Sequence, residues 1–288
     1  MTVLTTAFDE LAPLRRPIMV LALRGLFDIA EVATDAIDTL TEGHVATVVA
    51  SIDPDPFFDF TQERPMVEFD DDDVRQVRWP ENEFRVARFP GHAHDLVLLA
   101  GVEPHLRYAT FADAIIDVAT ALGCEAVVTI GAALAEAPHS RPPQVIGSST
   151  NDALIAALGL SRPQYQGVTG LVGVLQERLD RRGIPAVSLR AGVPHYLGNA
   201  KHPQASAALL LHLEHVLGVP TGHAALADEA ARWAGVHEEA VADDTNLAAY
   251  VRMLERNHDR QMEAQVQSGD DIAAAFEQFL RDQRPDEG

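Results

Sequence analysis

The sequence contains one cysteine, Cys124, and one lysine, Lys201, among its 288 residues. A single cysteine excludes the disulfide framework of small secreted proteins and favours a reducing compartment. No apolar stretch is long enough to span a bilayer, and the N-terminus lacks the basic and apolar pattern of a signal peptide. The net charge of −21 argues against nonspecific binding to nucleic acid or anionic membranes. We therefore expect a cytoplasmic protein that binds neither nucleic acid nor membranes.

Common catalytic and ligand-binding motifs are also absent. The sequence has no G-x-G-x-x-G, no G-x-x-x-x-G-K-[ST], no G-x-S-x-G and no paired C-x-x-C. The acidic run Asp70–Asp73 lacks the spaced ligands and turn glycine of a cation loop, so a solvated acidic turn is the better interpretation. His212 and His215 share a helix face, but no third ligand follows at the spacing of a zinc site. We therefore expect no metal and no cofactor.

Five short apolar runs alternate with helical patterns over the first 220 residues. The runs are residues 18–23, 45–50, 96–100, 126–130 and 186–189. They are mostly apolar on both faces rather than alternating, which is typical of strands in a parallel sheet covered by helices on both sides. Helical spacing of apolar residues occurs in the intervening segments 29–43, 108–122, 151–158, 167–179 and 203–217. The sequence predicts an α/β protein with three layers, α/β/α, and a mostly parallel sheet.

Residues 53–88 interrupt this alternation. They open with Asp-Pro-Asp-Pro and carry the aromatic residues Phe57, Phe58, Phe60, Phe69, Trp79 and Phe84. The segment is too long and too aromatic for a simple loop, so we predict an excursion with a hairpin at residues 74–88. One domain need not cover all of these aromatic side chains, and large exposed apolar patches usually mark interfaces. We therefore predict a homo-oligomer.

The C-terminal part has a different composition. Pro-Thr-Gly at residues 220–222 is the best boundary, which gives an α/β domain at residues 1–220 and an acidic helical extension at 221–288. Residues at helical spacing form an apolar stripe: Leu247, Val251 and Leu254, then Ile272, Phe276 and Phe279. Such a segment forms amphipathic helices, but its acidity makes it a poor core. We expect the extension to pack on the α/β domain without adding strands to the sheet.

Polar residues beside glycine and proline follow several of the predicted strands. Glu103 lies in G-V-E-P, His139 follows Gly131 by a loop, and His195 lies in V-P-H-Y. The carboxyl ends of parallel strands share one edge of the sheet, where ligands usually bind. A carboxylate and two imidazoles can share acid–base work there, or they can make local hydrogen bonds only. Both interpretations remain open. The candidate crevice comprises Gly25, Asp28, Gly101, Glu103, Gly131, His139, Pro194, His195 and Tyr196.

Seven stretches in order between residues 15 and 220 resemble the PAC2 family, named for proteasome assembly chaperone 2, and above all its actinobacterial branch. They are residues 25–34 (GLFDIAEVAT), 59–65 (DFTQERP), 79–88 (WPENEFRVAR), 98–104 (LLAGVEP), 130–142 (IGAALAEAPHSRP), 165–176 (YQGVTGLVGVLQ) and 193–196 (VPHY). The tail, with SGDDIAAAFEQFL at residues 268–280, is also similar to that branch.

The resemblance implies an α/β/α fold of the phosphorylase/hydrolase-like type, as in nucleoside phosphorylases. It also implies a chaperone-like role in 20S proteasome assembly, with proteasome subunits as partners and a trimer as the first expectation. Relatives can dock through a C-terminal hydrophobic-Tyr-any-residue tail, which the final residues 284–288 (RPDEG) lack. We therefore expect a binding protein that resembles a proteasome assembly chaperone. The alternative is an enzyme that acts on a nucleoside-like small molecule at the strand-end crevice.

Overall fold

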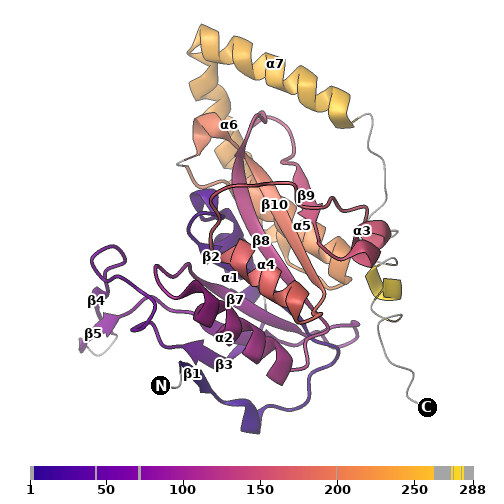
Figure 1. Cartoon of the computed structure of the whole chain (residues 1–288). Helices are drawn as coiled ribbons and strands as arrows, with labels where there is room; N and C mark the ends of the chain where they lie inside the picture. Colours follow the sequence, from indigo (N-terminus) through magenta and orange to yellow (C-terminus); the bar gives the residue numbers. More distant parts are fainter. Residues whose placement is uncertain are drawn as a thin grey trace.

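A mixed sheet of eight strands forms the centre of the fold (Figure 1). The computed structural model describes residues 3–42, 44–70, 73–198, 200–262, 274, 276–279 and 281. The strand order is β1-β3-β6-β7-β2-β8-β10-β9. The strands are β1 (Leu4–Thr6), β2 (Ile18–Arg24), β3 (Ala46–Ile52), β6 (Glu83–Ala87), β7 (Leu96–Val102), β8 (Ala126–Ala135), β9 (Val145–Ser148) and β10 (Ala186–Pro194).

The five apolar runs of the sequence are the five strands that run in one direction. Strands β7, β2, β8 and β10 pair in parallel. Strand β3 runs the same way, because it is separated from β7 by two antiparallel pairings through β6. The antiparallel members β1, β6 and β9 are short and carry fewer apolar residues. The predicted α/β class is confirmed, with a sheet that is mixed.

Helices cover both faces of the sheet, so the predicted three layers are present. Helices α1 (Val32–Glu42) and α5 (Pro203–Leu217) pack on one face, and α2 (Tyr108–Ala121) and α4 (Leu171–Arg181) pack on the other. Successive residues of one strand serve opposite cores: Val20 packs with α1 and α5, whereas Leu21 packs with α2 and α4. This alternation explains why most positions of the central strands are apolar on both faces.

The excursion contains a hairpin, but not the predicted one. Strands β4 (Met66–Phe69) and β5 (Arg75–Arg78) form a separate two-stranded sheet. Strand β6 instead enters the main sheet between β3 and β7, so the hairpin predicted at residues 74–88 is wrong. The reason lies in burial: Phe84 and Val86 face the core, whereas every residue of β4 and β5 is exposed. In the turn Asp70 accepts a hydrogen bond from the Val74 amide, and Asp71 and Asp72 lie outside the described residues.

Helix α4 begins at Leu171, four residues later than the pattern from Gly167 predicted. The preceding residues 161–169 are exposed and irregular, with Val168 82% exposed although its spacing fitted the apolar stripe. The start of the helix is set by a residue distant in sequence, because a Glu103 carboxylate oxygen accepts the Leu171 amide hydrogen at 2.6 Å. The short helix α3 (Asp152–Leu158) forms as predicted, with Asn151 as its cap.

The described part of the C-terminal extension is helical and adds no strand to the sheet. It contains η4 (His223–Leu226), α6 (Ala227–Ala242) and α7 (Thr245–Met262). Figure 1 shows α6 and α7 at the top, while residues 276–279 return along the right-hand side near α3. Phe276 and Phe279 are buried in the core shared with α1 and α5, and Ile272 lies outside the described residues. No helix in the described ranges has the length and apolar character to cross a membrane.

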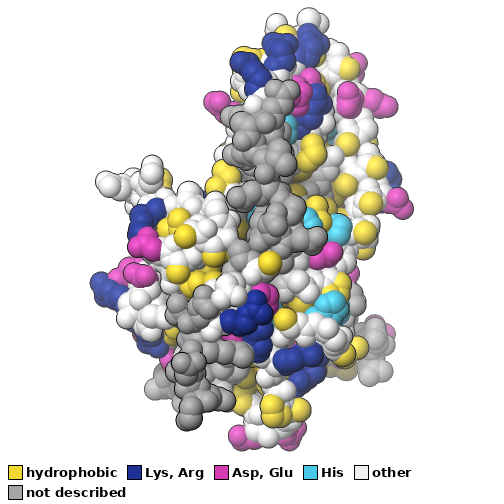
Figure 2. All heavy atoms as spheres, turned by 90° about the vertical axis from the view of Figure 1, so that its right-hand side faces the viewer, with side chains coloured by type: hydrophobic (Ala, Val, Ile, Leu, Met, Phe, Trp, Pro, Cys, Tyr) yellow, Lys and Arg dark blue, Asp and Glu magenta, His cyan; other side chains and the backbone are white. Residues whose placement is uncertain are grey.

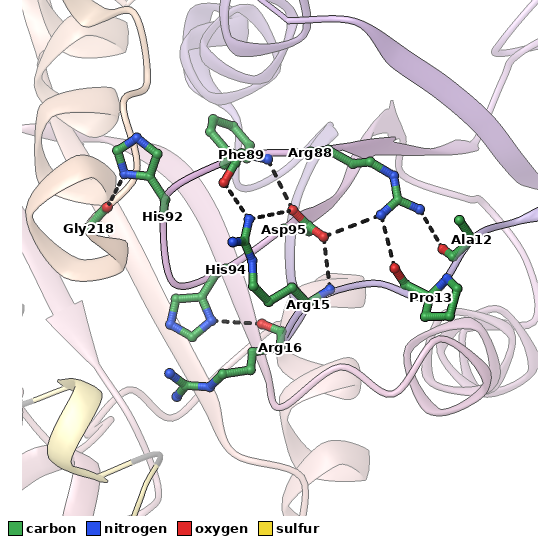
Figure 3. Close-up of polar contacts among 10 residues, drawn as sticks. All are labelled: Ala12, Pro13, Arg15, Arg16, Arg88, Phe89, His92, His94, Asp95 and Gly218. Carbon is green, nitrogen blue, oxygen red and sulfur yellow. Dashed lines mark hydrogen bonds and ion pairs between the residues drawn. The ribbon is translucent and has the colours of Figure 1, made fainter.

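A buried carboxylate organises the loops at the amino-terminal edge of the sheet. Asp95 accepts hydrogen bonds from the amides of Arg15, at 2.8 Å, and Phe89, at 3.0 Å (Figure 3). The guanidinium groups of Arg15 and Arg88 lie 3.7 and 3.6 Å from its oxygens. Two amides and two cations therefore stabilise the charge of a side chain that is almost fully buried.

The C-terminal segment is bound at this same edge. His94 lies with Nδ1 2.7 Å from the Arg16 carbonyl oxygen and with Nε2 2.5 Å from Glu277 Oε1. Arg16 donates to the other Glu277 oxygen at 2.8 Å. The pKa of Glu277 lies below its usual value, because the opposing effect of burial is outweighed by hydrogen bonds from Arg16 and His94. Glu277 thus fixes the segment that carries Phe276 and Phe279 into the core.

Candidate functional site

The three candidate catalytic residues all follow parallel strands, at the carboxyl-end edge of the sheet. Glu103 follows β7, His139 follows β8, and His195 follows β10. Strands β7 and β10 are separated by β2 and β8, so their ends lie roughly 14 Å apart at the usual spacing of neighbouring strands. The residues therefore share an edge, but Glu103 is too distant from His195 for direct proton transfer.

Both carboxylate oxygens of Glu103 accept hydrogen bonds from the backbone. Oε1 accepts from the Leu171 amide at 2.6 Å, and Oε2 accepts from the Leu26 amide at 2.8 Å. A Cβ atom added at Gly25 or Gly170 would collide with the Glu103 side chain, so both glycines permit its close approach. Glu103 joins the loop after β2 to the N-terminus of α4, where a negative charge is favourable. Glu103 therefore makes local hydrogen bonds, which is the alternative to an acid–base role that the sequence left open.

The crevice residues Asp28, Gly101 and Gly131 also have packing roles. Asp28 accepts hydrogen bonds from the amides of Ala33 and Thr34 and from the Thr34 hydroxyl, at the start of α1. Burial raises the pKa of Asp28 even though these hydrogen bonds act in the opposite direction. At Gly101 and Gly131 an added Cβ would collide with the Asn82 side chain and the Phe27 carbonyl, as the backbone approaches closely there.

His139, His195 and Tyr196 form one cluster beyond the ends of β8 and β10. The Tyr196 hydroxyl lies 2.9 Å from both the backbone nitrogen and Nδ1 of His139. His195 Nδ1 lies 3.2 Å from the Ala135 carbonyl oxygen, and the ring packs edge-on to Tyr250 of α7. Burial lowers the pKa of His139 and raises the pKa of Tyr196. Pro194, the last residue of β10, is buried beneath the cluster.

Trp233 of α6 covers this cluster, which the sequence pattern did not reveal. Its ring lies 6.4 Å from His139, 4.1 Å from His202 and 4.2 Å from His237. Burial lowers the pKa of His202 to about 4, so this side chain is neutral at pH 7. Within the described ranges no group of three or more His, Cys, Asp and Glu side chains is placed to hold a metal ion. In the sequence, the contact between Trp233 and the His139 cluster was indicated only by an isolated tryptophan in an acidic helix.

The hairpin β4–β5 carries a concentration of exposed apolar side chains. Figure 1 shows it projecting to the left, away from the body of the sheet. Its exposed apolar side chains are Met66, Val67, Phe69, Val74, Val77 and Trp79. Phe69 is 65% exposed and Trp79 is 46% exposed, the latter packing edge-on to Phe60 at 4.8 Å. Of the aromatic residues in segment 53–88, Phe57, Phe58 and Phe84 are buried in the core, whereas Phe69 and Trp79 stay exposed.

Basic and acidic side chains are mixed with one another on one face of the molecule. On the face that Figure 2 shows, Lys and Arg side chains are interspersed with Asp and Glu side chains and with small groups of apolar side chains. Binding to a phosphate backbone requires basic side chains clustered in a continuous area. The described side chains on this face therefore form no continuous basic surface.

Three solved structures show what this chain is similar to. A PAC2 family protein of Streptomyces avermitilis is 37% identical with a TM-score of 0.77, and the match covers 82% of this chain and 99% of that one. The proteasome-assembly chaperone homologue of Mycobacterium tuberculosis is 37% identical with a TM-score of 0.74, covering 81% and 99%. An archaeal proteasome activator of Pyrococcus furiosus, 21% identical with a TM-score of 0.65 over 83% and 99%, shares the fold.

None of the curated proteins compared with the chain matches it. The model of the PAC2 family matches residues 22–241, a range that runs from β2 through most of α6. That range includes the strand-end cluster, the β4–β5 hairpin and Trp233. The resemblance found in the seven sequence stretches is thus confirmed, and this chain belongs to the PAC2 family.

Proposed function

We propose that this protein is a binding protein that contacts 20S proteasome subunits, in the manner of an assembly chaperone. The family is related to proteasome assembly chaperone homologues and archaeal proteasome activators, as the names of its structural relatives state. The observation that carries the proposal is the exposed apolar hairpin β4–β5. Cytoplasmic localisation and a phosphorylase/hydrolase-like architecture belong to the same proposal.

The hairpin has the chemistry of a protein-binding surface. Phe, Trp and Met are enriched at the centre of protein interfaces, and this hairpin exposes one of each at Phe69, Trp79 and Met66. Strands β4 and β5 pair only with each other among the described strands, so both outer edges can accept a further strand. The hairpin is therefore the surface to which we assign docking.

The contacts at the strand ends favour binding over catalysis. Glu103 uses both carboxylate oxygens for backbone amides, and His139 is 2% exposed beneath α6. A nucleoside-processing enzyme needs an acid or base that reaches its substrate. The alternative of an enzyme at this crevice therefore has less support than a protein-binding role.

The proposal is tested by capture of proteasome subunits from the host. The tagged full-length protein should retain 20S subunits, identified by mass spectrometry, and the double variant Phe69→Ser/Val77→Ser should retain less than about a tenth as much, as expected for the loss of central apolar contacts. Val45→Ser is the matched control, because Val45 is 93% exposed and lies outside the hairpin. Equal capture by the hairpin variant, or no 20S subunit with the wild-type protein, would contradict the proposal.

A further inference from the structure

A cavity of about 1040 Å³ lies between the sheet and helix α4, on the face opposite α1 and α5. Its floor is formed by β8, β9 and β10, its wall by α4, and its roof by the irregular residues 161–169. Cavities that bind small molecules are commonly of this size and have a few polar groups among apolar ones. The lining residues include neither the β4–β5 hairpin nor His139, so this place is separate from both.

Hydroxyl groups replace apolar side chains on the floor of this cavity. The strand register puts Ser148, Ser188 and Thr129 in one row across β9, β10 and β8. The next position of that row is Leu21 of β2, which belongs to the apolar core. The three hydroxyl residues are buried, and Gln176 of α4 donates to Thr129 Oγ1 at 3.4 Å. A polar row on an otherwise apolar sheet face is the pattern of a ligand site rather than of core packing.

Arg190 is the charged group of this site. It lies two residues beyond Ser188 on the same face of β10 and pairs in register with Gly131. The Arg190 side chain lies next to Gly131, because a Cβ atom added there would make ordinary van der Waals contact with Arg190 Cγ at 3.7 Å. Arg190 is half-buried, lines the cavity, and has no hydrogen-bond or ion-pair partner within the described part of the chain.

The other charged side chains that line the cavity are already engaged. Arg162 pairs with Asp152, and Glu177 pairs with Arg181. Asp180 accepts a hydrogen bond from the Thr150 hydroxyl at 3.1 Å. Arg190 is therefore the cation whose charge the described contacts leave uncompensated. A partly desolvated guanidinium is stabilised by an anion, and its planar group suits two-pronged binding of a carboxylate or a phosphate.

We propose that this cavity binds a small organic anion, with a carboxylate or phosphate group on Arg190 and the hydroxyl row. The apolar body of the ligand packs against Leu26, Phe27 and Val172, which line the same cavity. Every described side chain of the roof at residues 161–169 is exposed, so displacing the roof to admit a ligand uncovers little apolar surface.

The test uses benzoate and phenyl phosphate as probes, with benzyl alcohol as the uncharged comparison. Calorimetric titration of the full-length protein should detect at least one of the anions with a Kd below about 10 mM, and benzyl alcohol should bind more weakly. Preference between the two anions distinguishes a carboxylate site from a phosphate site. The variant Arg190→Gln should weaken anion binding by about tenfold or more, the loss expected for a charge-assisted pair.

Arg162→Gln is the matched control, because this arginine lines the same cavity but is paired with Asp152. Its effect on probe binding should stay below about threefold, in the range of an exposed ion pair. Methyl NMR of the wild-type protein should show probe-dependent shifts at Val172, and this measurement decides the question if Arg190→Gln fails to fold. No binding of either anion, unchanged affinity in folded Arg190→Gln, or no shift at Val172 would overturn the proposal.

Discussion

Replacing Glu103 with glutamine tests whether this residue serves stability rather than catalysis. The carboxylate accepts the Leu26 and Leu171 amides, which are 77 and 68 residues away in sequence. A glutamine has one acceptor oxygen, so one of the two amides would face an NH₂ group and lose its hydrogen bond. Hydrogen bonds to a charged group contribute about 1.5–3 kcal/mol each, and Glu103 is half-buried, so we expect a total loss of about 2–4 kcal/mol.

The assay is urea unfolding followed by circular dichroism, with the free energy of unfolding extrapolated to water. Glu136→Gln is the control, because Glu136 is an exposed carboxylate of the loop after β8. It should change the free energy of unfolding by less than about 0.5 kcal/mol, as is usual for surface substitutions. A similarly small change in Glu103→Gln would refute the assignment of Glu103 to the junction between β2 and α4.

Three further predictions concern the extension, acid stability and assembly. Truncation after Pro220 should leave a folded α/β domain whose free energy of unfolding is lower by about 2–3 kcal/mol for each of the lost side chains Phe276 and Phe279. An insoluble, unfolded product would contradict the predicted domain boundary at residues 220–222. Because burial lowers the pKa of His202 to about 4, the unfolded chain binds a proton that the folded protein does not between about pH 6.5 and 4. As the pH falls through that range, the free energy of unfolding should therefore decrease, with up to about 3 kcal/mol of the decrease coming from His202. The variant His202→Asn retains a side-chain cap for α5 and should show a smaller decrease. A pH profile of His202→Asn identical to that of the wild-type protein would contradict this. Light scattering at micromolar concentration should give the mass of a homo-oligomer, with a trimer as the first expectation, and a monomer mass would contradict it. The Phe69→Ser/Val77→Ser variant should keep the oligomer mass, and a fall to the monomer would show that the hairpin joins copies of this chain instead of a proteasome subunit.

Much of the fold could be predicted from the sequence because its strands are recognisable one at a time. Residues 18–23 are apolar at every position and residues 126–130 are apolar except for Thr129, a pattern typical of a strand covered on both faces. The shorter strand β6 was assigned wrongly to a hairpin, because its alternating burial fits either partner when the chain is viewed alone. Pairing partners are a property of the whole sheet, so the position of β6 between β3 and β7 could not be predicted locally.

The candidate site shows the same division. The sequence by itself determined that Glu103, His139 and His195 follow parallel strands, since strand direction places all carboxyl ends at one edge. Tertiary structure decided what each side chain contacts: Glu103 meets two backbone amides, and His139 is covered by Trp233. It also decided that Ser148, Ser188 and Thr129 form one row, because register joins residues from three strands. Strand identity follows from near neighbours in the chain, whereas a site depends on contacts between residues far apart in it.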